Sequence, residues 1–599
     1  MSTHTIRVCC GTGCIANGSR GVAAALREAA ARAGAPAVSV ETQVKATGCH
    51  GFCAKGPVVA VDPDGISYYQ VKESDAEEIV ASLGGAPVER LLFRREDGTF
   101  ARGEADNPFY EGQVKIALRN VGKIDPLSLG DYRARGGYEA LEKALAMAPE
   151  DIIAEVEKSG LRGRGGAGFP TGTKWRSCAA CEETQRYVVC NGDEGDPGAF
   201  MDGYIMEGDP HSVIEGLAIC ALAVGAEEGF FYIRDEYLVA LDHMARALAD
   251  AEAAGILGDS VLGSGRRLRF EIVRGGGAFV CGESTALMAS IEGRVGEPRA
   301  KYIRSVQKGL WDKPTVLNNV ETLATVPVIL KEGYEAVQEL GVGRSRGTKT
   351  FAMVGKVKNG GLVEVPMGTT IRQLVFGNGG GIAGGRPFKS IQTGGPSGGC
   401  LPESLLDLPV DYESLDANGT MVGSGGMIVM DDRNCMVDVA KYYVGFLAQE
   451  SCGKCTPCRE GLRHMHAILT GICEGKGTEA DIERLEELGF TLKEASLCAL
   501  GKTAANPVLS TLRYFKEEYL SHIQDGFCPA GVCRALVVFG IDAEKCKACG
   551  LCAGSCPASC ISGEGKQPYE IDAARCTACG NCRKACHFEA IHPEKRMAV

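Results

Sequence analysis

The C-terminal part of the chain, residues 541–599, carries the feature that most constrains its fold, a repeated set of closely spaced cysteines. Each half of the repeat has the spacing CxxCxxCxxxC. The first three thiolates of such a run surround one [4Fe–4S] cube, and the fourth cysteine ligates the cube of the other half. The spacing therefore predicts two four-iron clusters with crossed ligands. The first would take Cys546, Cys549, Cys552 and Cys586, and the second Cys576, Cys579, Cys582 and Cys556.

This repeat is typical of a two-cluster ferredoxin-like domain, which is built from short turns punctuated by cysteines. A zinc ribbon is the alternative, but tetrahedral zinc takes only four ligands and would leave thiols unused. The second half has His587 where the first has Pro557, and this change does not touch a ligand. Cys560 belongs to neither ligand set, and we expect it to be a bystander.

The N-terminal residues 1–84 predict a small thioredoxin-like α/β unit with two further cysteine pairs. Cys9 and Cys14 follow the first predicted strand, and Cys49 and Cys53 follow the second; together they offer the four thiolates of a [2Fe–2S] cluster. Cys10 competes with Cys9 as first ligand, and zinc is the alternative occupant. Thioredoxin-type exchange would need a single CxxC pair. The predicted elements are strands at Thr5–Val8, Val38–Val44, Val58–Val61 and Ile66–Gln70 and helices at Gly21–Ala33 and Glu73–Leu83.

The rest of the chain divides by composition into segments that indicate a multidomain α/β protein. Residues 85–130 lack periodicity and predict a linker, whereas residues 131–345 alternate helices and short strands, as in a doubly wound, Rossmann-like domain. Residues 346–435 predict a β-grasp insert of the SLBB type, residues 436–525 a helical bundle, and residues 526–540 a second linker. Predicted elements of the doubly wound domain include strands at Tyr187–Cys190, Gly229–Ile233 and Leu268–Val273 and helices at His211–Val224 and Leu238–Ala254.

The 28 cysteines do not indicate a disulfide-rich secreted protein, because they fall in tight sets of the kind that bind metals in reducing compartments. No signal peptide is visible, and no run reaches the roughly 18 apolar residues that a membrane span needs. A net charge of −12 argues against nucleic acid as a partner. We therefore expect a cytoplasmic protein without direct membrane insertion.

A glycine-rich segment at residues 160–175, GLRGRGGAGFPTGTKW, is basic at both ends. Glycines let backbone N–H groups approach an anion closely, and Arg164 and Lys174 supply positive charge. The segment contains GxGxxG, but the residues before it look helical, so the strand-then-helix context of a dinucleotide fingerprint is not clearly met. A flexible loop without a ligand is the alternative interpretation.

Further segments carry polar or cysteine motifs of related kinds. Residues 191–197 (NGDEGDP) cluster three carboxylates with an amide after a predicted strand, and residues 275–283 (GGGAFVCGE) repeat the strand-to-glycine-loop pattern. Residues 318–322 (NNVET) open a predicted helix. A later CxxCxxC run and a remote cysteine predict a third [4Fe–4S] cluster, held by Cys452, Cys455, Cys458 and Cys498.

Taken together, these motifs resemble the flavin subunit of complex I-type NADH dehydrogenases. With iron–sulfur domains at both ends, the chain is more similar to the beta subunits of soluble multimeric [FeFe] hydrogenases and formate dehydrogenases, many of them electron-bifurcating. The resemblance covers essentially the whole chain. It implies FMN, NAD or NADP, one [2Fe–2S] cluster and three [4Fe–4S] clusters as cofactors. It also implies hydride transfer at the flavin, with the protein supplying orientation and electrostatics and no acid–base residue.

The resemblance assigns roles to particular residues. Phe169, Glu194 and Asp196 would face the nicotinamide nucleotide, and the cluster of the CxxCxxC run would be the first electron acceptor from the flavin. The residues implied to hold FMN are Gly163, Gly165, Gly166, Lys174, Asn191, Asp193, Gly282, Glu283, Asn318 and Asn319.

The chain departs from the NADH-specific pattern near the expected nucleotide. It has Ser284 where those members carry a second Glu, Ser177 where they carry an aromatic residue, and Arg304 in a segment that is usually Pro-Pro-Phe-Pro. A carboxylate near the adenosine ribose repels a 2′-phosphate, whereas arginine binds it. The lost acid and the gained Arg304 and Arg176 favour NADP(H), and retention of NAD is the alternative.

Cys528 and Cys533 lie just before the ferredoxin-like domain. They suit half of a structural zinc site, completed by Cys473 or by a histidine such as His464 or His466, and two free buried thiols are the alternative. The other cysteines lack partners at convincing spacing and are expected, for the most part, to be small core residues; they are Cys178, Cys181, Cys190, Cys220, Cys281, Cys400 and Cys435.

The sequence therefore predicts a diaphorase subunit that exchanges electrons between NAD(P)H, FMN and iron–sulfur clusters. It shows no hydrogenase active-site motif and no molybdopterin pattern, so we expect the terminal chemistry on a partner, a catalytic hydrogenase or formate dehydrogenase subunit. A small [2Fe–2S] subunit and ferredoxin are the other expected partners in a hetero-oligomer. The alternatives are a peripheral subunit of a complex I-type NADH:quinone oxidoreductase and an electron-relay scaffold without nucleotide turnover.

Overall fold

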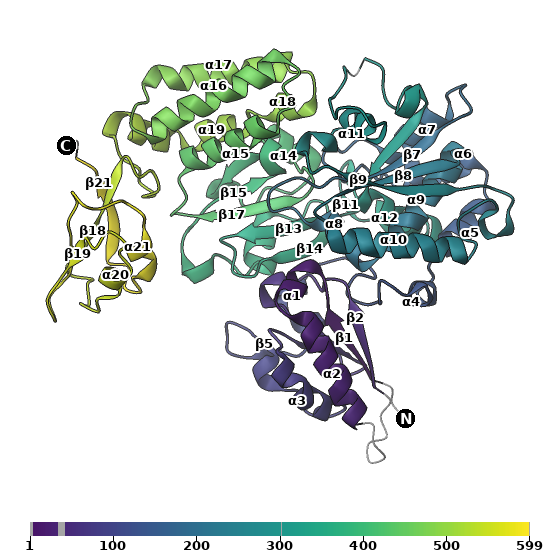
Figure 1. Cartoon of the computed structure of the whole chain (residues 1–599), viewed down its shortest axis with the longest axis horizontal. Coiled ribbons are helices and arrows are strands. Elements are labelled where there is room, and N and C mark those ends of the chain that lie inside the picture. The colour runs from purple at the N-terminus through teal and green to yellow at the C-terminus, as the bar shows by residue number, and fades with distance from the viewer. Residues whose placement is uncertain (1–3, 34–41, 301, 598–599) are drawn as a thin grey trace.

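The structure is a computed structural model that describes residues 4–33, 42–300 and 302–597. In Figure 1 the N-terminal domain (purple) packs below the large central α/β body, a helical layer (light green) covers the body from above, and the C-terminal domain (yellow) lies at one end. None of the described helices is long and apolar enough to cross a membrane. The predicted multidomain α/β fold is confirmed.

The N-terminal domain is a four-stranded sheet of order β2-β1-β3-β4, in which β1 and β2 are parallel and the other neighbours antiparallel. Apolar residues at alternating positions of β1 face a core shared with α2. Part of the strand predicted at residues 38–44 lies outside the described residues. The elements are β1 (His4–Cys9), α1 (Thr12–Ala16), α2 (Ser19–Ala33), β2 (Thr42–Thr47), β3 (Val59–Asp62), β4 (Ile66–Tyr68) and α3 (Ala76–Ala81).

Residues 85–128 wrap over the surface of the body as short turns and two brief strands, β5 (Phe93–Arg94) and β6 (Phe100–Ala101). They are not a loose tether, because Glu364 of the central body accepts hydrogen bonds from the backbone N–H groups of Ala117 and Leu118 at 2.9 and 2.8 Å. The wrap thereby joins the N-terminal domain to the body.

The first half of the body is a parallel sheet of order β10-β7-β8-β9. The chain runs from β7 outward to β8 and β9 and then returns to place β10 on the other side of β7. Strands β7 and β8 are nearly continuous buried runs, as expected of a parallel sheet covered by helices on both faces. The strands are β7 (Tyr187–Gly192), β8 (Glu228–Arg234), β9 (Arg269–Gly275) and β10 (Thr315–Asn319).

Helix α9 (Pro210–Val224) shows how local sequence directs the packing of this half. Asp209 caps its N-terminus by accepting from Ser212 N–H at 3.3 Å, Pro210 opens it, and Gly225 ends it with a φ of 73°. It is apolar on all sides and almost fully buried. The other helices of this half are α4 (Leu129–Ala134), α5 (Glu139–Leu145), α6 (Pro149–Lys158), α7 (Thr171–Ala179), α8 (Met201–Gly208), α10 (Leu238–Ala253), α11 (Ser284–Ile291), α12 (Val320–Glu332) and α13 (Glu335–Gln338).

The second half of the body is a mixed five-stranded sheet of order β14-β13-β17-β15-β16, which matches the predicted β-grasp insert. A buried ion pair between Lys349 on β13 and Glu321 on α12 ties this sheet to the first half. Its elements are β13 (Thr348–Gly355), β14 (Gly361–Pro366), β15 (Phe388–Thr393), β16 (Gly399–Pro402), α14 (Tyr412–Ala417) and β17 (Gly426–Asp431), preceded by the short hairpin β11 (Gly341–Val342) and β12 (Ser345–Arg346).

A helical bundle and a small two-lobed domain complete the chain. The bundle consists of α15 (Met436–Glu450), α16 (Thr456–Cys473), α17 (Glu479–Ala495), α18 (Ala499–Thr503) and α19 (Asn506–Leu520). In the C-terminal domain the antiparallel pair β18–β21 carries two cysteine-rich lobes. Its elements are β18 (Val537–Ile541), α20 (Leu551–Gly554), β19 (Ile561–Ser562), β20 (Glu570–Ile571), α21 (Asn581–Ala585) and β21 (Ile591–Lys595).

Candidate functional site

Polar residues gather where β7 and β10 end, which is the point at which the strand order of the parallel sheet reverses. In open α/β sheets a ligand crevice forms outside the carboxyl ends of the strands at such a switch point. Asn191 pairs with Asn319 across the two strands. The glycine-rich turn after β9 also reaches this edge, because Asn191 donates to the carbonyl of Gly282 at 3.0 Å. Three motifs far apart in sequence thus meet at one edge.

Two polar groups at this edge are buried without a partner. Asp193 is 8% exposed and Asn318 is 2% exposed. Neither carboxylate oxygen of Asp193 nor the amide nitrogen of Asn318 has a hydrogen-bond partner among the described residues. Burial raises the pKa of Asp193 to about 7. Because orphaned buried polar groups are rare, these acceptors and this donor fit a polar ligand such as FMN.

The glycine-rich segment between α6 and α7 closes as a tight turn over the same edge. The Gly163 N–H donates to the carbonyl of Phe169 at 2.8 Å, and the hydroxyl of Tyr412 donates to the carbonyl of Gly163 at 2.9 Å. Gly166 has a φ of 119°, which an L-residue rarely adopts. A Cβ on Gly165 would lie 3.0 Å from the Cβ of Asn319, so the turn sits directly against β10.

The two cations of this segment have different surroundings. Arg164 is buried, and its guanidinium donates to the backbone carbonyls of Arg162, Thr348 and Arg346. We expected Arg164 to supply charge for an anion, but it ties the turn to the start of β13. Lys174 on α7 donates to the carbonyl of Leu317 at 2.8 Å and so remains at the β10 end of the sheet.

Three of the predicted site residues cap helices. Glu283 accepts from the backbone N–H groups of Thr285 and Ala286 and caps α11, with Ser284 donating to it at 3.1 Å. Asn319 caps α12 and donates to Asp202 at 2.6 Å.

Glu194 caps α8, where it accepts from three backbone N–H groups and from the hydroxyl of Tyr237 at 2.9 Å. Asp196 points toward the β-grasp sheet and bonds to Ser424. Glu194 and Asp196 were expected to face the nucleotide. Their hydrogen bonds instead give Glu194 and Asp196 supporting positions.

Phe169 and Arg304 form the open side of the site. Phe169 is 39% exposed, and the guanidinium carbon of Arg304 lies 6.0 Å from the centre of its ring. Such an arrangement leaves an aromatic face and a positive charge available together. Arg176, the other arginine singled out in the sequence, is bound to Glu157 on the surface. Arg304 and not Arg176 therefore lies beside the exposed aromatic ring.

The third predicted four-iron site forms a cavity between the glycine turn after β9 and the helical bundle. Cys452, Cys455, Cys458 and Cys498 all line it, together with Val280 and Pro298 from the first half of the body. Burial, and then the neighbouring thiols of Cys455, Cys498 and Cys452, raise the pKa of Cys458 to about 11. The remote Cys498 is thus brought to the CxxCxxC run.

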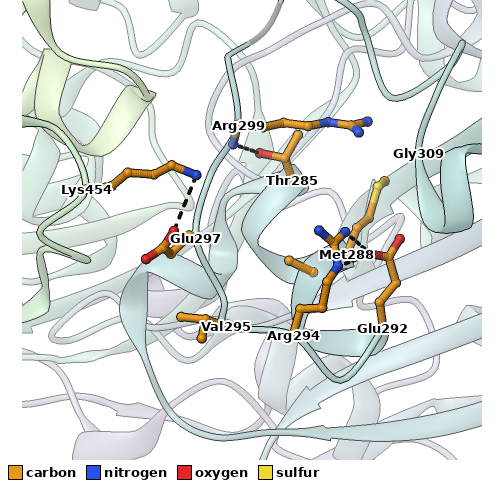
Figure 2. Close-up of a pocket in the computed structure, with 10 residues that line it drawn as sticks. Thr285, Met288, Glu292, Arg294, Val295, Glu297, Arg299, Gly309 and Lys454 are labelled. Atoms are coloured by element: carbon orange, nitrogen blue, oxygen red, sulfur yellow. Dashed lines mark hydrogen bonds and ion pairs between the residues drawn. The ribbon is translucent and has the colours of Figure 1, made fainter.

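A larger cavity of about 250 Å³ lies next to it, between α11 and the cysteine loop. Figure 2 shows its charged lining: Lys454 reaches Glu297 at 3.3 Å, and Arg294 pairs with Glu292. Lys454 lies between two of the predicted cluster ligands, so this ion pair fixes the cysteine loop to the segment that follows α11.

The N-terminal cysteine pairs also meet. Cys9 contacts both Cys14 and Cys49, and the sulfurs of Cys49 and Cys53 are 3.7 Å apart. Cys10 points away toward Ser19, whose hydroxyl is 3.8 Å from its sulfur. The structure therefore brings together the set that contains Cys9 and leaves Cys10 outside it.

Helix α8 connects this cysteine set to the β7–β10 edge. Its first turn is held by Glu194, and at its other end Glu207 accepts from the backbone N–H of Thr12 at 2.9 Å. Tyr204 lies between: burial, followed by the neighbouring Cys49 and Cys53 thiols, raises the pKa of its phenol. The cysteine set and the polar edge thus share one short, buried helix.

The cysteines of the C-terminal lobes group across the repeat. Burial, and then the thiols of Cys576, Cys579 and Cys556, raise the pKa of Cys582 to about 11. Cys556 comes from the first lobe and the other three from the second. This grouping has the crossed arrangement that the spacing predicts.

A further group of metal-binding side chains is fully buried where the bundle meets the C-terminal domain. Cys435, His522, Cys528 and Cys533 each offer one atom, and these atoms lie within 4.8 Å of one another. His522 donates its Nδ1–H to the carbonyl of Glu518 at 2.6 Å, which leaves Nε2 facing the sulfurs. The sulfurs of Cys435 and Cys533 are 3.9 Å apart, close to the roughly 3.8 Å implied by tetrahedral zinc with bonds of about 2.3 Å.

This group corrects the predicted partners of Cys528 and Cys533. The predicted third ligand, Cys473, lies next to Cys533 but outside the four-residue group. His464 and His466 lie on α16 and do not belong to the group either. Cys435 was expected to be a core residue. It caps the start of α15, about a hundred residues from the other three, and sequence spacing carries no signal for such a contact.

Three family models match the chain. Residues 1–84 match the thioredoxin-like [2Fe-2S] ferredoxin, residues 156–328 the Nuo51 FMN-binding domain, and residues 438–522 the NADH-ubiquinone oxidoreductase-F iron-sulfur binding region. These ranges contain the N-terminal cysteine set, the β7–β10 edge and the cavity lined by four cysteines. The presence of FMN, [2Fe–2S] and [4Fe–4S] domains, which the sequence predicted, is confirmed.

Whole-chain comparisons agree with the family models. The NADP-reducing hydrogenase subunit HndC of Solidesulfovibrio fructosivorans is 51% identical over 76% of this chain and 93% of its own length. The second F-type subunit of the NADH-quinone oxidoreductases of Rhizobium meliloti (strain 1021) is 45% identical over 69% of this chain and 99% of its own. Among solved structures, an NAD+-reducing [NiFe]-hydrogenase in the H2-reduced state matches with a TM-score of 0.61 and 29% identity, over 87% of this chain and 84% of that one.

Proposed function

Because the chain belongs to the family of FMN- and iron–sulfur-containing flavin subunits of NAD(P)-linked hydrogenases and complex I, we propose that it is the diaphorase subunit of an electron-bifurcating, NADP-linked hydrogenase. The observation that carries the proposal is the pair of orphaned polar groups on Asp193 and Asn318, placed one loop away from the cavity lined by four cysteines. Members of this family are oxidoreductase subunits of multi-subunit complexes. A formate dehydrogenase complex is the second setting that the sequence favours.

FMN, when bound, supplies the conversion between a two-electron hydride and single electrons. The residues of this chain bind and orient the reactants. The amide of Asn318 and the carboxyl of Asp193 are available to hold polar groups of the flavin, and the backbone of the Gly163–Gly168 turn is available for its phosphate. Phe169 offers an exposed face on which a nucleotide base can stack.

We further propose that the N-terminal [2Fe–2S] site takes part in the same electron path. Helix α8 has eight residues and rises roughly 12 Å, and it runs from Glu194 at the polar edge to Glu207 at the cysteine loop. Tyr204 replaces a residue that is usually serine in the resembling family. Its contact with Gly13, where a Cβ would approach the hydroxyl to 3.0 Å, gives that replacement a reason in domain packing.

Replacing Arg304 by alanine is expected to weaken NADPH more than NADH. An arginine–phosphate contact that NADH cannot make is worth about 1.4 kcal/mol or more, which corresponds to roughly a 10-fold rise in KM for NADPH. Steady-state dye reduction with both nucleotides measures this ratio. Arg176→Ala is the matched control, because Arg176 is engaged by Glu157 and its loss should leave the ratio unchanged. An equal effect of Arg304→Ala on both nucleotides would contradict a role in NADP recognition.

We propose zinc as the occupant of the group formed by Cys435, His522, Cys528 and Cys533. Cys528→Ser is expected to remove one zinc atom per chain and to lower the melting temperature by about 5 °C or more, because zinc binding at a closed four-ligand site is coupled to folding. Elemental analysis and thermal unfolding measure both effects. Cys473→Ser should keep the zinc, and its loss in that variant would return Cys473 to the ligand set.

Complex I-type assembly remains the competing setting, because F-type subunits of NADH-quinone oxidoreductases match the chain over most of their length. The C-terminal two-cluster domain favours the hydrogenase, since the usual complex I flavin subunit lacks it. Copurification decides between them: a catalytic hydrogenase chain supports the proposal, and membrane subunits of a quinone reductase would replace it.

The diaphorase activity itself is tested on the isolated chain under anaerobic conditions. We expect about one FMN per chain and NADPH-driven reduction of a one-electron dye. A chain that holds iron and sulfide but neither FMN nor dye reduction would be a relay scaffold without nucleotide turnover.

A further inference from the structure

The two lobes of the C-terminal domain follow the same backbone path with an offset of 30 residues, which aligns Cys546 with Cys576. Positive φ values recur at equivalent positions, with 52° at both Ala548 and Ala578 and 47° and 51° at Ser559 and Glu589. Helices α20 and α21 also start at equivalent positions. Each residue of one lobe therefore has a structural counterpart in the other.

The lobes differ at one buried position beside the fourth cysteine of each run. Cys560 follows Cys556 by four residues, and its counterpart after Cys586 is Ala590. Cys560 is 3% exposed and Ala590 is 2% exposed, so both side chains point into the domain. The first lobe thus carries one additional sulfur where the second has only a methyl group.

The additional sulfur lies among the ligands predicted for the second four-iron cluster. The sulfurs of Cys560 and Cys556 are 3.4 Å apart, which is direct contact. The thiol of Cys576, from the other lobe, is close enough to interact electrostatically with Cys560. Cys560 therefore contacts one member of the set Cys556, Cys576, Cys579 and Cys582 and neighbours a second.

We propose that Cys560 is a reserve ligand of the second [4Fe–4S] cluster, a proposal that rests on the assignment of this cluster to the C-terminal domain. With Cys556 in place, the Cys560 S–H packs against the ligand sulfur. Ligand exchange would break the iron–sulfur bond to Cys556 and form one to Cys560, with one proton passing from the thiol of Cys560 to the released thiolate. No electron is gained or lost, so the exchange needs no oxidant or reductant.

The reserve position is available with little rearrangement of the chain. The turn that carries both cysteines is closed by a hydrogen bond from the N–H of Ser559 to the carbonyl of Cys556 at 3.2 Å. Cys560 then enters β19, whose pairing with β20 fixes its backbone beside the second lobe. The first cluster has no such reserve, because the counterpart of Cys560 is Ala590.

The test compares full-length variants by iron content and low-temperature EPR. Cys556→Ala is expected to keep the wild-type iron content, with a shifted EPR signal, whereas Cys586→Ala should lose at least one iron atom. Adding Cys560→Ala to Cys556→Ala should remove the retained iron. An equal loss in Cys556→Ala and Cys586→Ala, or no further loss in the double variant, would overturn the proposal.

A gain of ligand tests the same idea without relying on the Cys556 variants. Ala590→Cys combined with Cys586→Ala is expected to recover the iron that Cys586→Ala loses, and a failure to recover it counts against the proposal. Wild-type protein without two four-iron signals from the C-terminal domain would sink the cluster assignment itself. That result is distinct from an iron-replete wild type whose Cys556→Ala variant loses iron.

Discussion

Replacing Cys498 by alanine is expected to remove the four-iron cluster from the cavity between the flavin-binding half and the helical bundle. Three ligands remain on the CxxCxxC run, but a four-iron cube needs a fourth thiolate. Cys498 begins α18, and Glu283 at the β7–β10 edge is close enough to interact electrostatically with it. The site is therefore the iron–sulfur position nearest the predicted flavin residues.

We expect this variant to lose one EPR signal and at least one iron atom, and to slow NADPH-driven reduction of the remaining clusters about 100-fold or more. Dye reduction at the flavin should change by less than about 2-fold, since no predicted FMN contact is altered. Cys400→Ala, at a fully buried cysteine of β16, is the matched control and should lose no iron. Unchanged cluster reduction in Cys498→Ala would show that electrons bypass this cavity.

The second large effect is expected for Asn318→Asp at the end of β10. The side-chain oxygen of Asn318 accepts from the indole N–H of Trp175 at 2.9 Å, and aspartate keeps this bond. The amide nitrogen, which has no partner among the described residues, becomes a second carboxylate oxygen near the orphaned carboxyl of Asp193. The change removes a donor for the ligand and adds a like charge.

A mismatched buried charge costs roughly 2–3 kcal/mol, so the dissociation constant of FMN should rise about 100-fold. Fluorescence titration of FMN into the FMN-depleted, cluster-loaded protein measures it. Asn378→Asp is the control, because Asn378 is equally buried and donates to the carbonyls of Phe109 and Glu111 away from the site. Equal FMN affinity in both variants would remove Asn318 from the flavin site.

Local patterns in the sequence were sufficient for most of the fold. The strand predicted at Tyr187–Cys190 is β7, and the helix predicted at His211–Val224 is α9, because long apolar runs with clear capping residues leave few alternatives. Strand β10 was not predicted. Its sequence, TVLNN, is short and ends in two asparagines, so only its pairing with β7 identifies it.

Spacing identified cysteine sets whose members lie close together in sequence, but it could not identify partners that packing brings together. Cys435 and His522 reach Cys528 and Cys533 only because α15 and α19 pack beside the start of the C-terminal domain. Arg164 illustrates the same limit for charge. The sequence shows a cation in a glycine-rich turn, but only the fold shows that backbone carbonyls occupy its donors.

Anaerobic titration of the purified chain with NADPH, followed by visible absorption and EPR, tests the central claim most directly. The account predicts about one FMN and about 14 iron atoms per chain, from one two-iron and three four-iron clusters. It also predicts that NADPH bleaches the flavin and produces reduced-cluster EPR signals in the same sample. Bleaching of the flavin without any cluster signal, or cluster reduction in a chain that holds no FMN, would contradict it.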